Sequence, residues 1–207
     1  MATNNNPSLD PANNDTLAGM MMFAFTKMLQ NVNGMLPAQV MSYDRATNRV
    51  QVQILMDIVG TDGTQYPRQR LASIPVFVFG GGGFRLSFPL KAGSLGWVIA
   101  NDRDISNFLT SYSQSPPNTA RIKQFSDGVF FPDAMNGLDT ISGTDANNAV
   151  LQNDDGTVTI SLSPTGVTIT ANHLNINLGS PAGKLAVNGL INASGPVTGG
   201  VPYMPGV

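Results

Sequence analysis

The sequence predicts a mainly β protein that begins with one helix, continues into a compact barrel and ends in a β tail that needs further copies of the chain. Three observations predict this class. Apolar residues recur at helical spacing near the N-terminus, strand-like runs separated by turn residues fill positions 36–128, and short alternating strands follow from position 149. The 207 residues suffice for one domain or two small ones.

The composition excludes several classes of protein. Charged residues make up 12% of the chain, about half of the ~25% typical of soluble domains. The net charge is −2 and no basic run is present, so the sequence lacks the charge pattern that binds nucleic-acid phosphates. Cysteine is absent, which excludes disulfides and thiolate metal sites. Stability must therefore come from packing or from assembly.

Residues 1–34 are predicted to form a polar tail and an amphipathic helix. The helix begins at a cap, Asn14 or Asp15, and ends near Asn33–Gly34, with apolar residues at Leu17, Met20, Met21, Ala24, Met28 and Leu29. This face either packs on the following domain or docks on a partner, and flexible methionines suit an irregular partner groove. The apolar run 17–29 is too short to span a membrane and lacks the basic start of a secretory signal, which indicates synthesis in the cytoplasm.

Residues 35–128 are predicted to form a small barrel of five or six strands, the last of them RIKQF at 121–125. The strand from position 50 should bury one face made of Val50, Val52, Ile54 and Met56. The turn TDGT at 61–64 should close a hairpin. Residues 129–148 show no sustained alternation and are interpreted as a connector.

Residues 149–193 alternate as strands should, yet supply few residues to cover their apolar side. An isolated ribbon of this kind is marginal in water and leaves its edges unpaired. No Phe, Tyr or Trp occurs between 132 and 202, so small aliphatic side chains must fill a narrow core. Three ribbons around one axis would provide it. The predicted trimer core is Val158, Ile160, Leu162, Val167, Ile169, Leu174, Ile176, Leu178, Leu185 and Val187, with a bulge or bend between Ile169 and Leu174.

Several motifs in the barrel region follow one another in a characteristic order. They are LPAQV (36–40) with Tyr43–Asp44, NRVQVQ (48–53), IPVFVFGGGGF (74–84), SFPLKAG (87–93), NDRD (101–104) and FSDGVF (125–130). Together with the turn-punctuated β tail, they resemble the central membrane-piercing spike proteins of contractile-tailed bacteriophage baseplates. That family has an N-terminal barrel of the oligosaccharide/oligonucleotide-binding (OB) type and continues as an intertwined trimeric β-helix or prism.

The resemblance implies a homotrimer in the virion, in the tail baseplate. Three barrels would form a collar that contacts the hub proteins through the N-terminal helix and barrel, and the β-helix would pierce the host outer membrane when the tail contracts. Such spikes often end in an apex where a His-x-His pair from each chain binds iron. This chain has one histidine, His173, so residues 194–207 are interpreted instead as a tip or as the attachment segment for a separate tip protein.

Candidate chemical sites are few. The GGGG run at 80–83 lacks the Gly-Lys-Ser/Thr of a phosphate loop and suits a hairpin. Three copies of His173 could converge on a metal or anion, and the alternative is a histidine that faces solvent at a bend. Asp102 and Asp104 beside Arg103, and Asp154–Asp155, suit turns and salt bridges better than a calcium loop. No glutamate is present and no Ser-His-Asp arrangement is arguable, so no enzyme and no cofactor are predicted.

Two other functions fit parts of the sequence. An OB-type binding module would need exposed aromatic residues with basic neighbours, which Phe84–Arg85 and Tyr66–Arg68 approach. A trimeric hub-to-tip adaptor would hold a tip or fibre through the C-terminal PYMPGV. Deletion of residues 195–207 would separate the adaptor from the spike, because only the adaptor would lose a partner protein while the trimer stayed intact.

Overall fold

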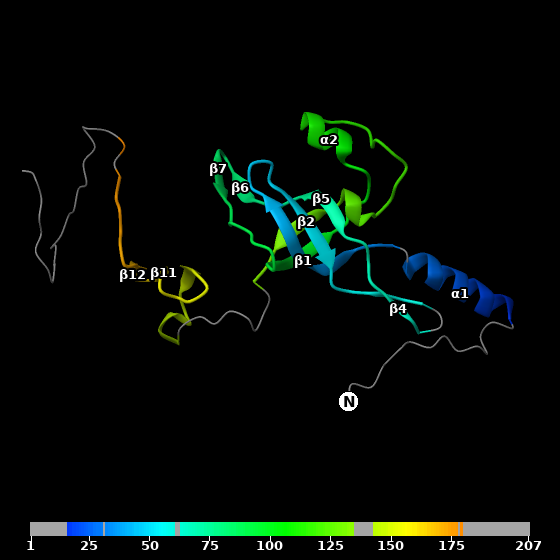
Figure 1. Ribbon diagram of the computed structural model, residues 1–207, viewed down its shortest axis with the longest axis horizontal. Helices are drawn as coiled ribbons and strands as arrows, with labels where there is room; N and C mark the ends of the chain where they lie inside the picture. The colour runs from blue at the N-terminus through cyan, green and yellow to red at the C-terminus, as the bar shows by residue number, and fades with distance from the viewer. Residues whose placement is uncertain (1–15, 31, 61–62, 135–142, 178, 180–207) are drawn as a thin grey trace, which may run out of the picture. The chain divides into compact units, whose positions relative to one another are not determined.

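A computed structural model describes residues 16–30, 32–60, 63–134, 143–177 and 179 of the chain (Figure 1). The chain divides into two compact units, Met1–Thr140 and Ile141–Val207. The first unit contains the N-terminal helix and a curled β-sheet. The second contains a small sheet of three strands. The predicted mainly β class with an N-terminal helix is confirmed for the described residues.

The N-terminal helix α1 runs from Leu17 to Gln30. Its cap is Thr16, whose side-chain oxygen accepts a hydrogen bond from the backbone N–H of Gly19 at 3.0 Å. The sequence analysis placed the cap at Asn14 or Asp15, which lie outside the described residues. No residue of α1 is buried, so the helix does not pack its apolar face on the described part of its own chain.

A five-stranded antiparallel sheet forms the centre of the first unit. Its strands are β1 (Met35–Asp44), β2 (Arg49–Ile54), β5 (Leu71–Pro75), β8 (Leu95–Ile99) and β9 (Val129–Pro132), in the order β5-β2-β1-β8-β9. The sheet curls into a half-barrel (Figure 1). A parallel bridge joins Val76 to Phe130, and the Phe77 N–H donates to the Phe130 carbonyl at 2.8 Å, so the two edges meet at one point. The structure thus shows the curled sheet of the predicted barrel.

Alternation along β1 and β2 produces the core of this sheet. Val50, Val52 and Ile54 are buried as predicted, and Val52 and Ile54 lie across from Val40 and Ala38 of β1. Met56, the fourth residue assigned to this face, is exposed. The strand ends at Ile54 because the chain then leaves the ladder, so the alternation no longer sets the direction of Met56.

Two hairpins extend from the sheet. Strand β3 (Ile58–Val59) pairs with β4 (Gln65–Tyr66), which confirms the predicted hairpin, although Thr61 and Asp62 lie outside the described residues. Strand β6 (Phe79–Gly81) pairs with β7 (Phe84–Leu86), and the turn consists of Gly82 and Gly83. Both have positive φ angles, 58° and 87°, as a two-residue type I′ turn requires. The glycine run therefore forms a hairpin turn, as predicted.

The segment between β8 and β9 differs from the prediction. It contains α2 (Ser106–Ser111) and a 3₁₀ turn, η2 (Phe125–Asp127), which the sequence analysis did not predict. Residues 121–125, predicted as the last strand, form no strand. The ladder is instead completed by β9, which lies in the stretch interpreted as a connector, and its Phe130 is the largest fully buried side chain. The short run VFFP shows no extended alternation and ends in proline, so the period-two signal was too weak to reveal this strand.

The second unit contains a 3₁₀ turn, η3 (Gly143–Asp145), followed by β10 (Ala149–Gln152), β11 (Thr159–Ser163) and β12 (Gly166–Thr170). The three strands pair antiparallel within one chain, in the order β10-β11-β12. Strand β12 ends at Thr170, inside the interval where a bend was predicted. The winding of three chains into a β-helix stays a prediction.

Candidate functional site

The three-stranded sheet of the second unit exposes one purely aliphatic face. In an antiparallel ladder, residues directly opposite one another point to the same side. Ile160 of β11 lies opposite Leu151 on one neighbour and Ile169 on the other, and Leu162 lies opposite Ala149 and Val167. All six side chains are exposed in the single chain, with Ile160, at the centre, the least so at 36%. This aliphatic face comprises Ala149, Leu151, Ile160, Leu162, Val167 and Ile169.

The opposite face of β11 is closed by the chain itself. Ser161 is buried, and its hydroxyl donates to Asp145 of η3 at 2.6 Å. The Asn148 amide donates to both, at 2.9 Å to Ser161 and 3.0 Å to Asp145. The hydrogen bond from Ser161, followed by that from Asn148, lowers the pKa of Asp145 below its ordinary value, although partial burial acts the other way. The chain itself thus covers the opposite face at Ser161, whereas no described residue of this unit covers the aliphatic face.

The predicted trimer-core residues therefore fall into three groups. Ile160, Leu162, Val167 and Ile169 share the aliphatic face, as the alternation predicted. Val158, Leu174 and Ile176 are exposed apolar residues outside the three strands. Leu178, Leu185 and Val187 lie outside the described residues. Ser161, Asp145 and Asn148 were missed, because a buried serine in a strand becomes visible only when the strand register and η3 are known.

The metal candidate His173 is exposed in the single chain, and its Nε2 lies 3.1 Å from Oδ1 of Asn175. Within the described ranges, no three His, Asp or Glu side chains gather as a metal site would require. Convergence of three histidines depends on other copies of the chain, and it stays a prediction.

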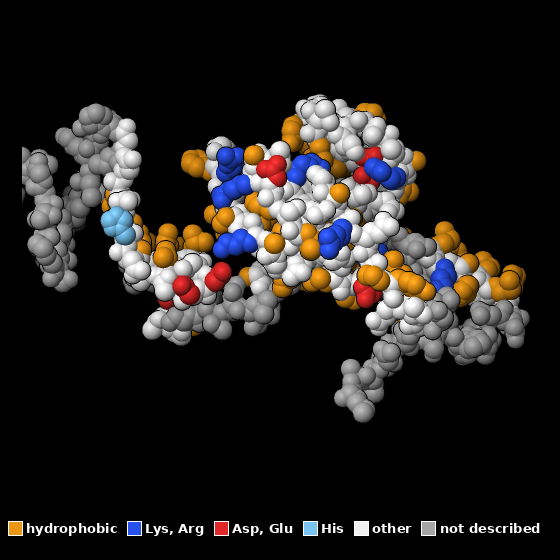
Figure 2. Space-filling model, in the orientation of Figure 1, with side chains coloured by type: hydrophobic (Ala, Val, Ile, Leu, Met, Phe, Trp, Pro, Cys, Tyr) orange, Lys and Arg blue, Asp and Glu red, His pale blue; other side chains and the backbone are white. Residues whose placement is uncertain are grey.

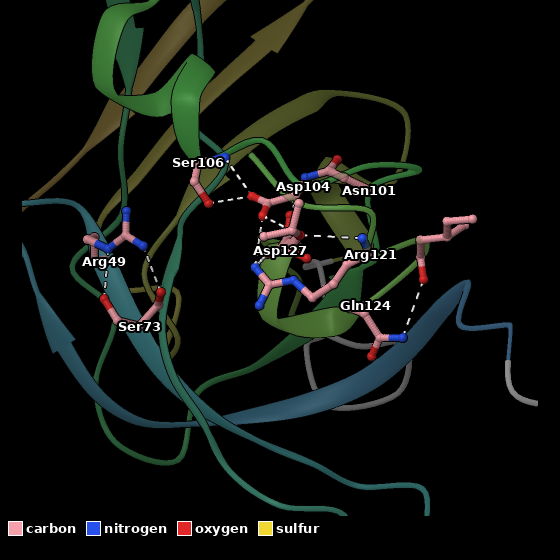
Figure 3. A network of polar contacts seen from close by, with 10 residues as sticks. Arg49, Ser73, Asn101, Asp104, Ser106, Arg121, Gln124 and Asp127 are labelled. Atoms are coloured by element: carbon pink, nitrogen blue, oxygen red, sulfur yellow. Dashed lines mark hydrogen bonds and ion pairs between the residues drawn. The ribbon is translucent and has the colours of Figure 1, made fainter. Parts of the chain in front are cut away.

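The aspartates near β8 form structural contacts, as predicted. The buried Asp104 accepts hydrogen bonds from the backbone and hydroxyl of Ser106, from Thr119 at 2.8 Å and from Arg121 at 3.0 Å. Arg121 also reaches Asp127 at 2.8 Å, so it lies between two carboxylates (Figure 3). The hydroxyl and then the backbone of Ser106, with Thr119 and Arg121, lower the pKa of Asp104 to about 2. This network holds the segment between β8 and β9 in place.

Two other predicted aspartates, Asp102 and Asp155, also have local roles. Asp102 pairs with Lys123 at 2.6 Å on the surface. Asp155 accepts hydrogen bonds from the backbone and hydroxyl of Thr157, and from Asn153, in the turn before β11. These are the turn and salt-bridge roles expected from the sequence.

Exposed aromatic residues occur on the β6–β7 hairpin. Phe79 pairs with Leu86, and Phe84, two positions before Leu86 on the same side, is 85% exposed. Arg85 lies opposite Gly80 and so points to the other face of the hairpin. A base-stacking platform combines aromatic rings with a basic groove along the backbone of the nucleic acid. The pair Phe84–Arg85 does not place both groups on one face, which weakens the binding-module alternative.

The helix α1 provides a second apolar surface, visible as a band of hydrophobic side chains along it (Figure 2). Apart from the half-buried Phe23, the exposure of its large apolar residues ranges from 53% for Met21 to 76% for Leu17. No helix among the described residues is long and apolar enough to cross a membrane. The prediction left two roles open for this face, and no residue of it is buried in the single chain.

Comparison with known proteins finds a similarity within the first unit. Residues 36–133 match the family model described as the phage protein Gp138 N-terminal domain, which covers slightly less than half of the 207 residues. The match begins at the second residue of β1 and ends one residue after β9, so it takes in all of the five-stranded sheet except Met35. No curated protein matches the chain. The first unit is therefore similar to a phage protein domain, and this match supports a phage structural protein.

Proposed function

We propose that the chain is a structural component of a contractile-tail baseplate, a homotrimeric central spike that transmits the force of contraction and pierces the host outer envelope. The observation that carries the proposal is the aliphatic face of β10–β12. Its opposite side is covered at Ser161 by Asp145 and Asn148, whereas the aliphatic side is exposed, and the proposal places the further copies there. The phage-domain match of residues 36–133 supports the placement in a tail.

Three copies would cover the aliphatic face by directing it toward a common axis. Side chains from Leu151, Ile160 and Ile169 form one row across the three strands, and Ala149, Leu162 and Val167 form the next. Rows of small branched residues suit a narrow core, where larger rings would not pack. The edge strands β10 and β12 would then pair with, or lie beside, strands of neighbouring copies.

The mechanism is mechanical. A spike under axial load fails when one strand peels from its neighbours, and a core shared among chains couples each strand to the others. Chemistry is not required: the proposal assigns no catalytic group and no cofactor. In the same scheme the barrel and α1 lie at the hub end, and residues 194–207 are at the tip end or hold a separate tip protein.

The native mass of the full chain tests the proposal. One chain has a mass of 21.8 kDa, so light scattering should give about three times that value, and the assembly should resist mild denaturant. A dimer would indicate two sheets packed face to face instead of a three-walled core. A monomer at micromolar concentration would refute the proposed spike and leave the binding module as the better reading of the barrel.

The hub-to-tip adaptor shares this trimer and differs only in what the C-terminal segment does. No contact among the described residues favours it over the spike. Its test remains the deletion of residues 195–207, assayed by retention of a partner protein in assembled tails.

A further inference from the structure

The exposed face of α1 has a pattern that indicates what covers it. At about 100° per residue, the large apolar side chains of α1 occupy an arc of roughly 200°. Polar and small residues, Gly19, Thr26 and Gln30, fall on the opposite side with Lys27 at the edge. Phe23 lies within this polar stripe, and the Lys27 ammonium lies 5.7 Å from the centre of its ring. Lys27 and Phe23 are half-buried, whereas the wide apolar arc is exposed.

The arc contains a heptad seam. Leu17, Met21, Ala24 and Met28 follow one another at spacings of four, three and four residues, the a/d spacing of helices that pack in register. Met20 and Phe25 flank the seam on its two sides. A seam limited to a and d positions suits two helices, but a helix that contacts two neighbours needs apolar residues beyond it. The width of the arc therefore fits three helices better than two.

The end of α1 is tied to the barrel that follows it. The Asn33 amide donates to the Lys123 carbonyl at 2.9 Å, and the Ala100 N–H donates to the Gly34 carbonyl at 2.8 Å. These contacts lie within four residues of the last residue of the helix, Gln30. Each barrel thus holds the C-terminal end of its own α1, and barrels brought together would bring the helices to a high effective concentration.

The charge and the length of α1 also favour packing between copies of this helix. Lys27 is the only charged residue of α1 and lies outside the seam, so identical helices can meet without placing like charges together. An isolated helix of 14 residues is marginal in water and gains its stability from packing. The same face of two further copies of the chain would supply that packing.

We propose that the α1 helices of three copies pack against one another as a parallel three-helix bundle along the seam Leu17–Met21–Ala24–Met28. This inference rests on the proposed homotrimer and adds a second trimer contact, on the other side of the barrel in sequence from the β tail. The bundle leaves Met22 and Leu29 near the outer margin of the arc, where hub proteins could still contact it.

Single-cysteine cross-linking of the full chain tests the bundle, since the sequence contains no cysteine that could compete. Ala24→Cys places a thiol in the seam, and Thr26→Cys places one in the polar stripe as the matched control. A disulfide forms only between Cα atoms closer than about 7 Å, so mild oxidation should give covalent dimers from Ala24→Cys at least about fivefold faster than from Thr26→Cys. Because three thiols form one pair, at most two of every three chains should be linked.

Light scattering on the same samples distinguishes a failure of the helix bundle from a failure of the proposed homotrimer. A trimer in which Ala24→Cys forms no cross-link, or forms it no faster than Thr26→Cys, overturns the helix bundle and leaves the trimer standing. A monomer overturns the homotrimer and, with it, the bundle. Met28→Cys, the next seam position, gives a second measurement: it should cross-link as Ala24→Cys does, and its failure to do so in intact trimers also refutes packing along this seam.

Discussion

Replacing Ile160 with aspartate tests whether the aliphatic face is buried in an assembly or exposed to solvent. Ile160 lies at the centre of β11, between Leu151 and Ile169, and is 36% exposed in the single chain. If that exposure persists in solution, Ile160→Asp is a surface change that costs within about 0.5 kcal/mol. The variant should then fold and keep its mass.

The expected cost is far larger if three copies enclose the face. Burial of the remaining exposed third of an isoleucine contributes about 0.5–1 kcal/mol per copy. An unpaired carboxylate in the same place costs several kcal/mol more, because it loses its water without gaining a partner. With three copies in one narrow core, the total is on the order of 10 kcal/mol, enough to dissociate the tail assembly.

Thr168→Asp is the matched control. Thr168 lies opposite Ser161 on the other face of the sheet and is exposed, so the same charge there should leave the trimer intact. Light scattering and denaturant resistance of both variants provide the comparison. An Ile160→Asp protein with unchanged trimer mass and resistance would refute the enclosed core, and equal loss in both variants would show that the sheet does not distinguish its faces.

Two further predictions concern the barrel. Gly96→Ala places a Cβ 2.5 Å from Cζ of Phe130 and too close to the neighbouring backbone, so thermal unfolding should occur at lower temperature, with a loss of about 1–3 kcal/mol. Asp104 has a pKa lowered to about 2, chiefly by Ser106, so its contribution to stability is present above the unfolded pKa near 3.8 and is lost as the pH falls toward 2. Asp104→Asn should lower the melting temperature at pH 7 and flatten this acid dependence, and an unchanged acid profile would contradict the assignment.

The core of the barrel could be predicted where alternation continues along a paired strand. Val50, Val52 and Ile54 follow period two because β2 pairs with a strand on each side. Met56 breaks the pattern because the length of a strand depends on its partners: Ile54 is paired with Ala38, and the chain turns away after it. The sequence of β2 alone does not mark that end.

Two other features depended on tertiary contacts that no local pattern reveals. Phe130 is in a four-residue strand, and its burial requires a glycine, Gly96, on the adjacent strand to make room for the ring. Ser161 is buried because η3 folds back over it, although its position in an alternating strand indicated only a polar face. In both cases the determining contact joins residues far apart in sequence.

Both sheets alternate apolar and polar residues, but only the first encloses its apolar side chains within one chain. In the first unit, five strands curl until their edges meet at Val76 and Phe130, so one chain encloses its own aliphatic residues. Three strands are too few to curl around a core, and the sheet β10-β11-β12 can bury its aliphatic face only against another surface. A curled sheet that encloses its core within one chain can serve as a rigid base. Under the proposed spike, a tail that is incomplete in one chain would gain its stiffness from assembly, as a load-bearing assembly of several chains requires.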